Sequence, residues 1–171
     1  MNPVALTIKS NAGVQRVLIS SISIVKPGET IEHTIQAIWD TGATGSVIAK
    51  SVAKNLNLIP TGISQVSTAN GIALQNTYTI NIKFPNGLEI VGVVVTEVDG
   101  LSGGCDGLIG MDIITLGDFS ITNYNGVTCM SFRVPSQHEI DYVKNPHMKG
   151  NQNPPTGGSN YTPPKKKRKK R

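Results

Sequence analysis

The group most capable of chemistry in this sequence is the carboxylate of Asp40, which opens the segment Asp40-Thr41-Gly42-Ala43-Thr44. A mostly apolar run from Ile35 to Trp39 precedes it and is typical of a buried strand. A carboxylate that a strand delivers into a tight turn can act as a general base on water. Gly42 would let another backbone come close, and Thr41 offers a hydroxyl. Taken alone, however, Asp at a strand end is ordinary, because Asp favours turns.

Support comes from two later segments. Gly107-Leu108-Ile109-Gly110 forms a second motif, in which an apolar pair and a glycine lead into a short helix expected over 112–116. Between the two motifs, Asn70-Gly71 separates two extended runs, 64–69 and 74–84. Both residues of this dipeptide accept positive φ, so its position between two strands predicts a hairpin.

In this order of parts, over about residues 14–122, the sequence resembles the retropepsin-like aspartic proteases. The resemblance implies that Asp40 is catalytic and that the four residues after it support the active site: Thr41, Gly42, Ala43 and Thr44. It also implies a flap that closes over a bound peptide, made of Thr68, Ala69, Asn70, Gly71 and Ile72. The family's second motif would be Leu108, Ile109 and Gly110.

Two features depart from the family pattern. Trp39 stands where a smaller aliphatic residue or Phe is more usual, which could alter how the active-site turn packs. The C-terminal hairpin runs past the family's typical end, which leaves open which strands form the dimer interface.

The implied chemistry needs two carboxylates that share one proton and hold one water. The ionised carboxylate takes a proton from the water, and the protonated one donates a hydrogen bond to the peptide carbonyl oxygen. This chain contains one Asp-Thr-Gly segment, so we expect an obligate homodimer in which the partner supplies the second Asp40. The implied substrate is a peptide or protein, and neither a metal nor a cofactor takes part.

A second hypothesis keeps the fold without the catalysis: a retropepsin-like module that binds peptides or protein partners and does not cleave them. Three further acids are interpreted as loop, helix-end or surface groups: Asp106, Asp112 and Asp118. The histidines share no metal-ligand spacing with the two cysteines, so no metal site is predicted. Cys105 and Cys129 are expected to be free thiols, because two cysteines make no disulfide framework.

The elements that must position these residues are many short strands separated by Gly, Asn and Pro turns, which predict an all-β sandwich or barrel. The resemblance narrows this to a retropepsin-like closed β-barrel, and helical spacing over 49–58 and 112–116 adds one or two short helices. Segments 5–9 and 14–25 flank a turn at 11–13 and predict an N-terminal hairpin. Segments 119–122 and 127–133 flank Asn125-Gly126 and predict a last hairpin.

The composition changes near residue 136, so we predict a protease-like domain over 1–136 and a disordered Pro-, Gly- and Asn-rich linker over 137–171. The linker ends in seven basic residues: Lys165, Lys166, Lys167, Arg168, Lys169, Lys170 and Arg171. Such a tail is expected to make at most weak, salt-dependent contact with nucleic acid or another polyanion.

The net charge of +5 belongs to this tail, because residues 1–164 hold nine basic and eleven acidic groups. Charge alone therefore excludes a basic nucleic-acid platform in the folded part. No apolar stretch approaches the roughly 20 residues of a membrane span, and the first residues lack the basic and apolar regions of a signal peptide. A cytoplasmic location is expected, or a nuclear one in a eukaryotic cell, where the tail is similar to a nuclear-localisation signal.

Overall fold

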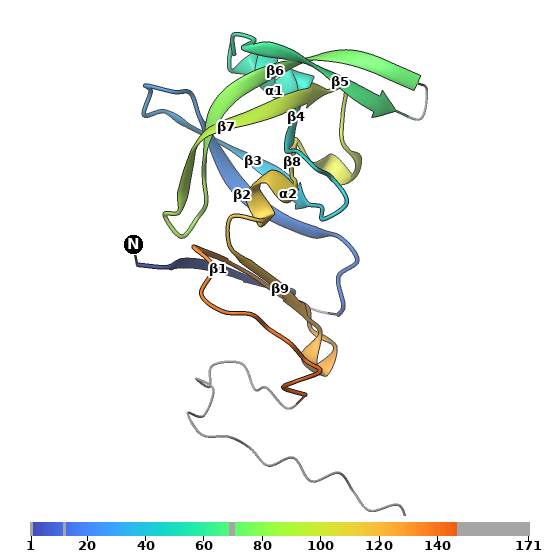
Figure 1. Cartoon of the computed structure of the whole chain (residues 1–171). Helices are drawn as coiled ribbons and strands as arrows, with labels where there is room; N and C mark the ends of the chain where they lie inside the picture. Colours follow the sequence, from blue (N-terminus) through green and yellow to red (C-terminus); the bar gives the residue numbers. More distant parts are fainter. Residues whose placement is uncertain (1, 12, 69–70, 147–171) are drawn as a thin grey trace, which may run out of the picture. The chain divides into compact units, whose positions relative to one another are not determined.

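The computed structural model of the chain describes residues 2–11, 13–68 and 71–146 (Figure 1). The chain divides into one compact unit, Met1–His138, and a second unit that starts at Glu139. No described helix is long and apolar enough to cross a membrane. Most of the predicted linker and the whole polybasic tail, Lys165 to Arg171, lie outside the described residues, so their disorder and polyanion contact stay predictions.

The first unit is built around a closed barrel. Its strands are β2 (Leu18–Val25), β3 (Glu32–Trp39), β4 (Val47–Ala49), β5 (Gly62–Thr68), β6 (Gly71–Lys83), β7 (Glu89–Val98) and β8 (Gly107–Ile109). Among the described residues these form one sheet in the order β2-β3-β8-β4-β7-β6-β5, and an additional pairing of β2 with β6 closes the ring (Figure 1). Branched side chains such as Ile24, Ile80 and Ile82 are almost fully buried and make up its core.

Two short helices leave this sheet directly. Helix α1 (Lys50–Asn55) continues from β4, and helix α2 (Met111–Ile114) follows β8 after one residue. Two single 3-10 turns lie at Ser102–Gly104 and Tyr124–Gly126. The expected all-β barrel with short helices is confirmed, although both helices are shorter than their predicted ranges.

The chain's first and last strands form a separate sheet, which we call the terminal sheet. It consists of β1 (Val4–Lys9), β10 (Cys129–Val134) and β9 (Asp118–Thr122), with β10 in the middle. The predicted last hairpin, β9–β10, is confirmed, but the predicted N-terminal hairpin is wrong because β1 pairs with β10 and not with β2. The register places buried Leu6 opposite fully buried Phe132. Matching apolar faces, and not the nearby turn, decide the partner of β1.

An aromatic cluster packs the barrel against the terminal sheet. All three phenylalanines of the chain surround its only tryptophan, Trp39, with ring centroids 5.7 Å away for Phe84, 5.5 Å for Phe119 and 5.2 Å for Phe132. Phe84 directly follows β6, whereas the other two rings belong to β9 and β10. The indole Nε1 of Trp39 donates a hydrogen bond of 2.9 Å to Ser20 Oγ, which satisfies its one polar group in the core.

Asp118 joins β9 to the end of β10 and to the residues that follow it. Arg133 donates to Asp118 Oδ2 through Nε at 3.0 Å and through Nη2, and the Gln137 amide donates to the same oxygen at 2.9 Å. Ser136 donates to Oδ1. Burial acts to raise the pKa of Asp118, but the hydrogen bonds from Ser136, Arg133 and Gln137 outweigh it and hold this pKa at about 2. The ionised carboxylate therefore ties β9 to β10 and to the residues after it.

We predict that Asp118→Asn lowers the free energy of unfolding by about 2 kcal/mol at pH 7. Because the folded-state pKa lies below the unfolded one, this stabilisation is present above about pH 4 and is lost as the pH falls toward 2. Urea unfolding of the parent and the variant, followed by Trp39 fluorescence at pH 7, 4, 3 and 2, measures this difference in the free energy of unfolding. Glu29→Gln, at an exposed ion pair with Lys26, is the control and should change little. A loss of equal size at every pH would contradict the assignment.

Candidate active site

Backbone hydrogen bonds fix the Asp40 turn, residues 40–44, at the end of β3. The Asp40 amide donates to the Ile109 carbonyl at 3.0 Å, which extends the parallel pairing of β3 with β8 by one residue. The Ala43 amide donates to the Asp40 carbonyl at 3.3 Å, and the Gly42 amide donates to Asp40 Oδ1 at 2.8 Å. Among the described residues no group donates to Oδ2. One carboxylate oxygen is thus oriented by the backbone, and the other is available to water or a substrate.

This arrangement favours a residue without a side chain at position 42. A Cβ at position 42 would lie 3.1 Å from Asp40 Oδ1, closer than the oriented carboxylate easily allows. Asp40 is half-buried, whereas Thr41 and Gly42 are exposed. The turn therefore presents its backbone and the Thr41 hydroxyl to the surroundings, as an approaching peptide or second subunit would require.

The second motif, residues 107–110, lies directly against the Asp40 turn. A Cβ on Gly110 would lie 2.6 Å from the carbonyl carbon and oxygen of Gly45, so only glycine fits this contact. The first amides of α2 continue it: Met111 donates to the Ala43 carbonyl at 2.8 Å, and Asp112 donates to the Thr44 carbonyl at 3.1 Å. The second motif thus holds the carbonyl groups of the Asp40 turn in place.

Ser46 completes this contact and was missed by the sequence analysis. Its side chain is 2% exposed. Its Oγ accepts a hydrogen bond from the Gly110 amide at 3.0 Å and donates one to Asp112 Oδ1 at 2.8 Å, while its amide donates to Asp112 Oδ2 at 3.0 Å. Asp112 is exposed, as expected, but it also holds Ser46, two residues after the Asp40 turn. The sequence signal for this bridge is the Ser46 hydroxyl shortly after the Asp40 turn and the Asp112 carboxylate shortly after Gly110.

A cavity of about 330 Å³ opens beside the Asp40 carboxylate. Arg16, Asp40 and Thr41 line it together with apolar side chains from β2, β3 and β9 and from the residue before β2: Val17, Leu18, Ile38, Trp39, Phe119 and Ile121. Asp40 is the only acid among these described lining residues. One carboxylate in a largely apolar cavity provides half of the pair that shared-proton chemistry needs.

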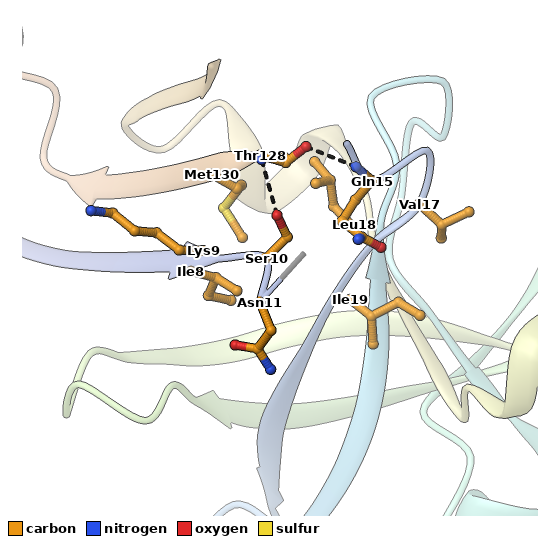
Figure 2. A pocket seen from close by; sticks show the side chains of 10 residues that line it. All are labelled: Ile8, Lys9, Ser10, Asn11, Gln15, Val17, Leu18, Ile19, Thr128 and Met130. Atoms are coloured by element: carbon orange, nitrogen blue, oxygen red, sulfur yellow. Dashed lines mark hydrogen bonds between the residues drawn. The ribbon is translucent and has the colours of Figure 1, made fainter. Parts of the chain in front are cut away.

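A larger cavity of about 500 Å³ lies between β1, β10 and the start of β2 (Figure 2). It shares Val17 and Leu18 with the Asp40 cavity, but no acid is among its described lining residues. The hydrogen bonds drawn in Figure 2 join Thr128 to the Ser10 hydroxyl and to the Gln15 amide, at 3.0 and 2.8 Å. These polar groups connect strand ends, so we assign them a structural role.

The predicted flap corresponds to the hairpin of β5 and β6. Ala69 and Asn70 lie outside the described residues, whereas Thr68 ends β5, Gly71 begins β6 and Ile72 follows. No described residue of this hairpin lines the Asp40 cavity. The structure therefore brings the Asp40 turn and the second motif together and leaves the hairpin apart from them.

Among the described residues, no group of three or more His, Cys, Asp and Glu side chains could hold a metal ion. Cys105 is buried, Cys129 is half-buried, and both are free thiols, as predicted.

Comparisons with known proteins identify a family. A family model described as aspartyl protease matches residues 27–113, just over half of the chain, including both motifs. No curated protein sequence matches. Among solved structures, a retropepsin-like aspartic protease from Rickettsia conorii is 16% identical, covers 78% of this chain and 96% of its own, and has a TM-score of 0.49. The simian foamy virus (mac) protease is 17% identical over 56% of this chain and 91% of its own, with a TM-score of 0.38.

We predict that Gly110→Ala destabilises the domain by about 1–3 kcal/mol, because the added methyl group meets backbone atoms of Gly45 that cannot swing away. Thermal unfolding measures the loss. Gly100→Ala is the matched control, since a Cβ there meets nothing within 4 Å and should leave stability almost unchanged. Equal stability of the two variants would show that the contact tolerates a side chain.

Proposed function

The chain belongs to the aspartyl protease family, and from that premise we propose that it is an aspartic endopeptidase active as a homodimer. The observation that carries the proposal is Asp40, which lines a largely apolar cavity and has one carboxylate oxygen held by the Gly42 amide. Arg16 lines the same cavity, but no described cation forms an ion pair with Asp40, so the carboxylate can still hold a water.

The need for a second carboxylate is an argument for the homodimer. Asp40 is the one acid among the described residues that line its cavity, and the chemistry requires a second carboxylate a few ångströms away. A two-fold axis beside the Asp40 turn would supply the same residue from a second copy. Two such carboxylates cannot both ionise easily, so the pair would share one proton.

The reaction then needs no covalent enzyme intermediate. The ionised Asp40 takes a proton from the water as the water oxygen attacks the peptide carbonyl carbon. The protonated Asp40 of the other copy gives its proton to the carbonyl oxygen as negative charge develops there, and a tetrahedral diol forms. When the C–N bond breaks, the leaving nitrogen takes the proton that the first Asp40 drew from the water. One diol hydroxyl returns its proton to the other Asp40, so the two carboxylates again share one proton.

The surface beside the cavity has the properties of an interface. Val17 and Ile121 line the cavity and are 53% and 46% exposed, and Val14 nearby in sequence is 56% exposed. The outer edges of β1 and β9 have no neighbouring strand among the described residues. Exposed apolar side chains next to a free strand edge favour association with another chain.

The substrate class is a peptide or protein in extended form. The β5–β6 hairpin carries Ile63, Ile72 and Leu74, which are 71%, 68% and 72% exposed. The pairing register puts all three on one face of the hairpin, because Ile72 lies opposite Ser67 and Leu74 opposite Gln65. Such a face can cover apolar side chains of a bound peptide when the hairpin closes as a flap.

We predict that Asp40→Asn lowers peptide cleavage at least about 100-fold, because the amide cannot act as the general base. The fold should persist, since the Asn oxygen can still accept from the Gly42 amide. Cleavage of a mixed peptide library by the parent and the variant, read by mass spectrometry, tests this. Equal cleavage would refute the role of Asp40. An inactive parent that is dimeric and binds peptides would favour the non-catalytic binding module.

We also predict that Ile121→Asp raises the dimer dissociation constant about tenfold or more, because a charge would have to be buried in the apolar interface. Specific activity should then fall at low protein concentration, which sedimentation and kinetics measure together. Ile59→Asp is the control, since Ile59 is 82% exposed and does not line the Asp40 cavity. If both variants dimerise like the parent, the interface lies elsewhere.

A further inference from the structure

The β5–β6 hairpin leaves the barrel at a sharply defined point. Strand β6 pairs with β7 from Thr77, opposite Thr96, to Lys83. Residues 71–76 of β6 pair only with β5 among the described strands. Beyond Thr77 the hairpin is thus a two-stranded ribbon that projects from the other strands (Figure 1). A two-stranded ribbon has little stability of its own, so its direction must be set at its root.

A buried carboxylate lies at this root. Glu97 directly follows the last β7 residue that pairs with β6, and it is 7% exposed. Its Oε1 accepts a hydrogen bond from Asn76 Nδ2 at 2.9 Å and a longer one from the Asn76 amide at 3.5 Å. Its Oε2 accepts from the Tyr78 hydroxyl at 2.7 Å. The side chain of Glu97 therefore extends the β6–β7 connection by one residue, at the point where backbone pairing stops.

The contacts of Glu97 require a more exact geometry than the packing of apolar side chains between strands. A carboxylate removed from water is unfavourable unless both of its oxygens are used, and here the donors are an amide and a phenol rather than a cation. Tyr78 is 5% exposed. Burial, and then its hydrogen bond to Glu97, raise the pKa of Tyr78, so its hydroxyl stays protonated as the donor.

The same side of β6 continues into the ribbon. Side chains alternate along a strand, so Ile72, Leu74, Asn76 and Tyr78 share one face. Tyr78 is buried in the barrel, whereas Ile72 and Leu74 are exposed beyond it. Fixing Asn76 and Tyr78 therefore also fixes the direction in which the apolar face of the ribbon points.

We propose that Glu97 is the positioning residue of the flap, which holds the ribbon at the angle from which it closes on a peptide. The proposal rests on the proposed protease function. Glu97 touches no reacting atom, and it would act on the fraction of molecules whose flap can close. A smaller closing-competent fraction weakens apparent binding in proportion and leaves turnover of the bound peptide nearly unchanged.

Replacements at position 97 separate charge from shape. Glutamine keeps one acceptor oxygen and replaces the other with an amide nitrogen, so the negative charge is lost and the Tyr78 hydroxyl has to accept a hydrogen bond where it donated one. Leucine fills similar space and accepts nothing. Tyr78→Phe removes one donor and leaves the carboxylate in place. Asp99→Asn is the matched control, because Asp99 lies two residues away and its ion pair with Lys50 is exposed.

The experiment compares these four variants with the parent by amide hydrogen exchange and by steady-state peptide cleavage. For Glu97→Gln and Glu97→Leu we expect the ribbon amides over 63–67 and 72–75 to exchange about tenfold faster, with β2 and β10 unchanged. We expect KM to rise about threefold or more while kcat stays within about twofold. Tyr78→Phe should also raise the exchange rate of the ribbon amides and KM, but by smaller factors. Asp99→Asn should match the parent in both quantities.

Ribbon exchange in both Glu97 variants equal to that of Asp99→Asn would overturn the proposal. So would faster exchange spread over the whole barrel in Glu97→Gln and Tyr78→Phe, because Glu97 would then be a general core residue. A fall in kcat at unchanged KM would also contradict it. If the parent cleaves no peptide, the protease function fails, and ribbon exchange alone still decides whether Glu97 anchors the hairpin.

Discussion

The backbone contact between Gly110 and Gly45 is the constraint on which the site depends. A side chain at position 110 would overlap the Gly45 carbonyl group, so two strand ends far apart in the sequence can meet only because glycine stands there. From this contact follow the hydrogen bonds of Met111 and Asp112 to the Asp40 turn and the buried bridge through Ser46. The turn that carries the proposed catalytic group is thus held by backbone atoms of a second element.

Trp39 connects this turn to the rest of the molecule. It is the residue before Asp40, and its ring packs on phenylalanines from the barrel and from the terminal sheet. The terminal sheet consequently lies beside the Asp40 cavity, where Phe119 and Ile121 of β9 line it. The same packing that stabilises the domain therefore brings an apolar, partly exposed strand next to Asp40.

The Asp40 turn and the β5–β6 ribbon differ in how firmly they are held. The Asp40 turn is fixed by several short hydrogen bonds to neighbouring strands and helix α2. The β5–β6 ribbon is attached at one end, through Thr77 and the carboxylate of Glu97. Catalysis by two carboxylates needs a rigid pair, whereas entry of a peptide needs a cover that can move, and the fold supplies each with a matching kind of support.

Features with local signals can be read from the sequence alone. The all-β fold, the turn after the strand that ends at Trp39 and most of the strands follow from it, because turn residues and apolar alternation act over a few positions. The partner of β1, the bridge from Ser46 to Asp112 and the buried position of Glu97 were decided only by the tertiary structure. Each depends on which distant strand presents a matching apolar face or a free donor, and no short segment carries that information.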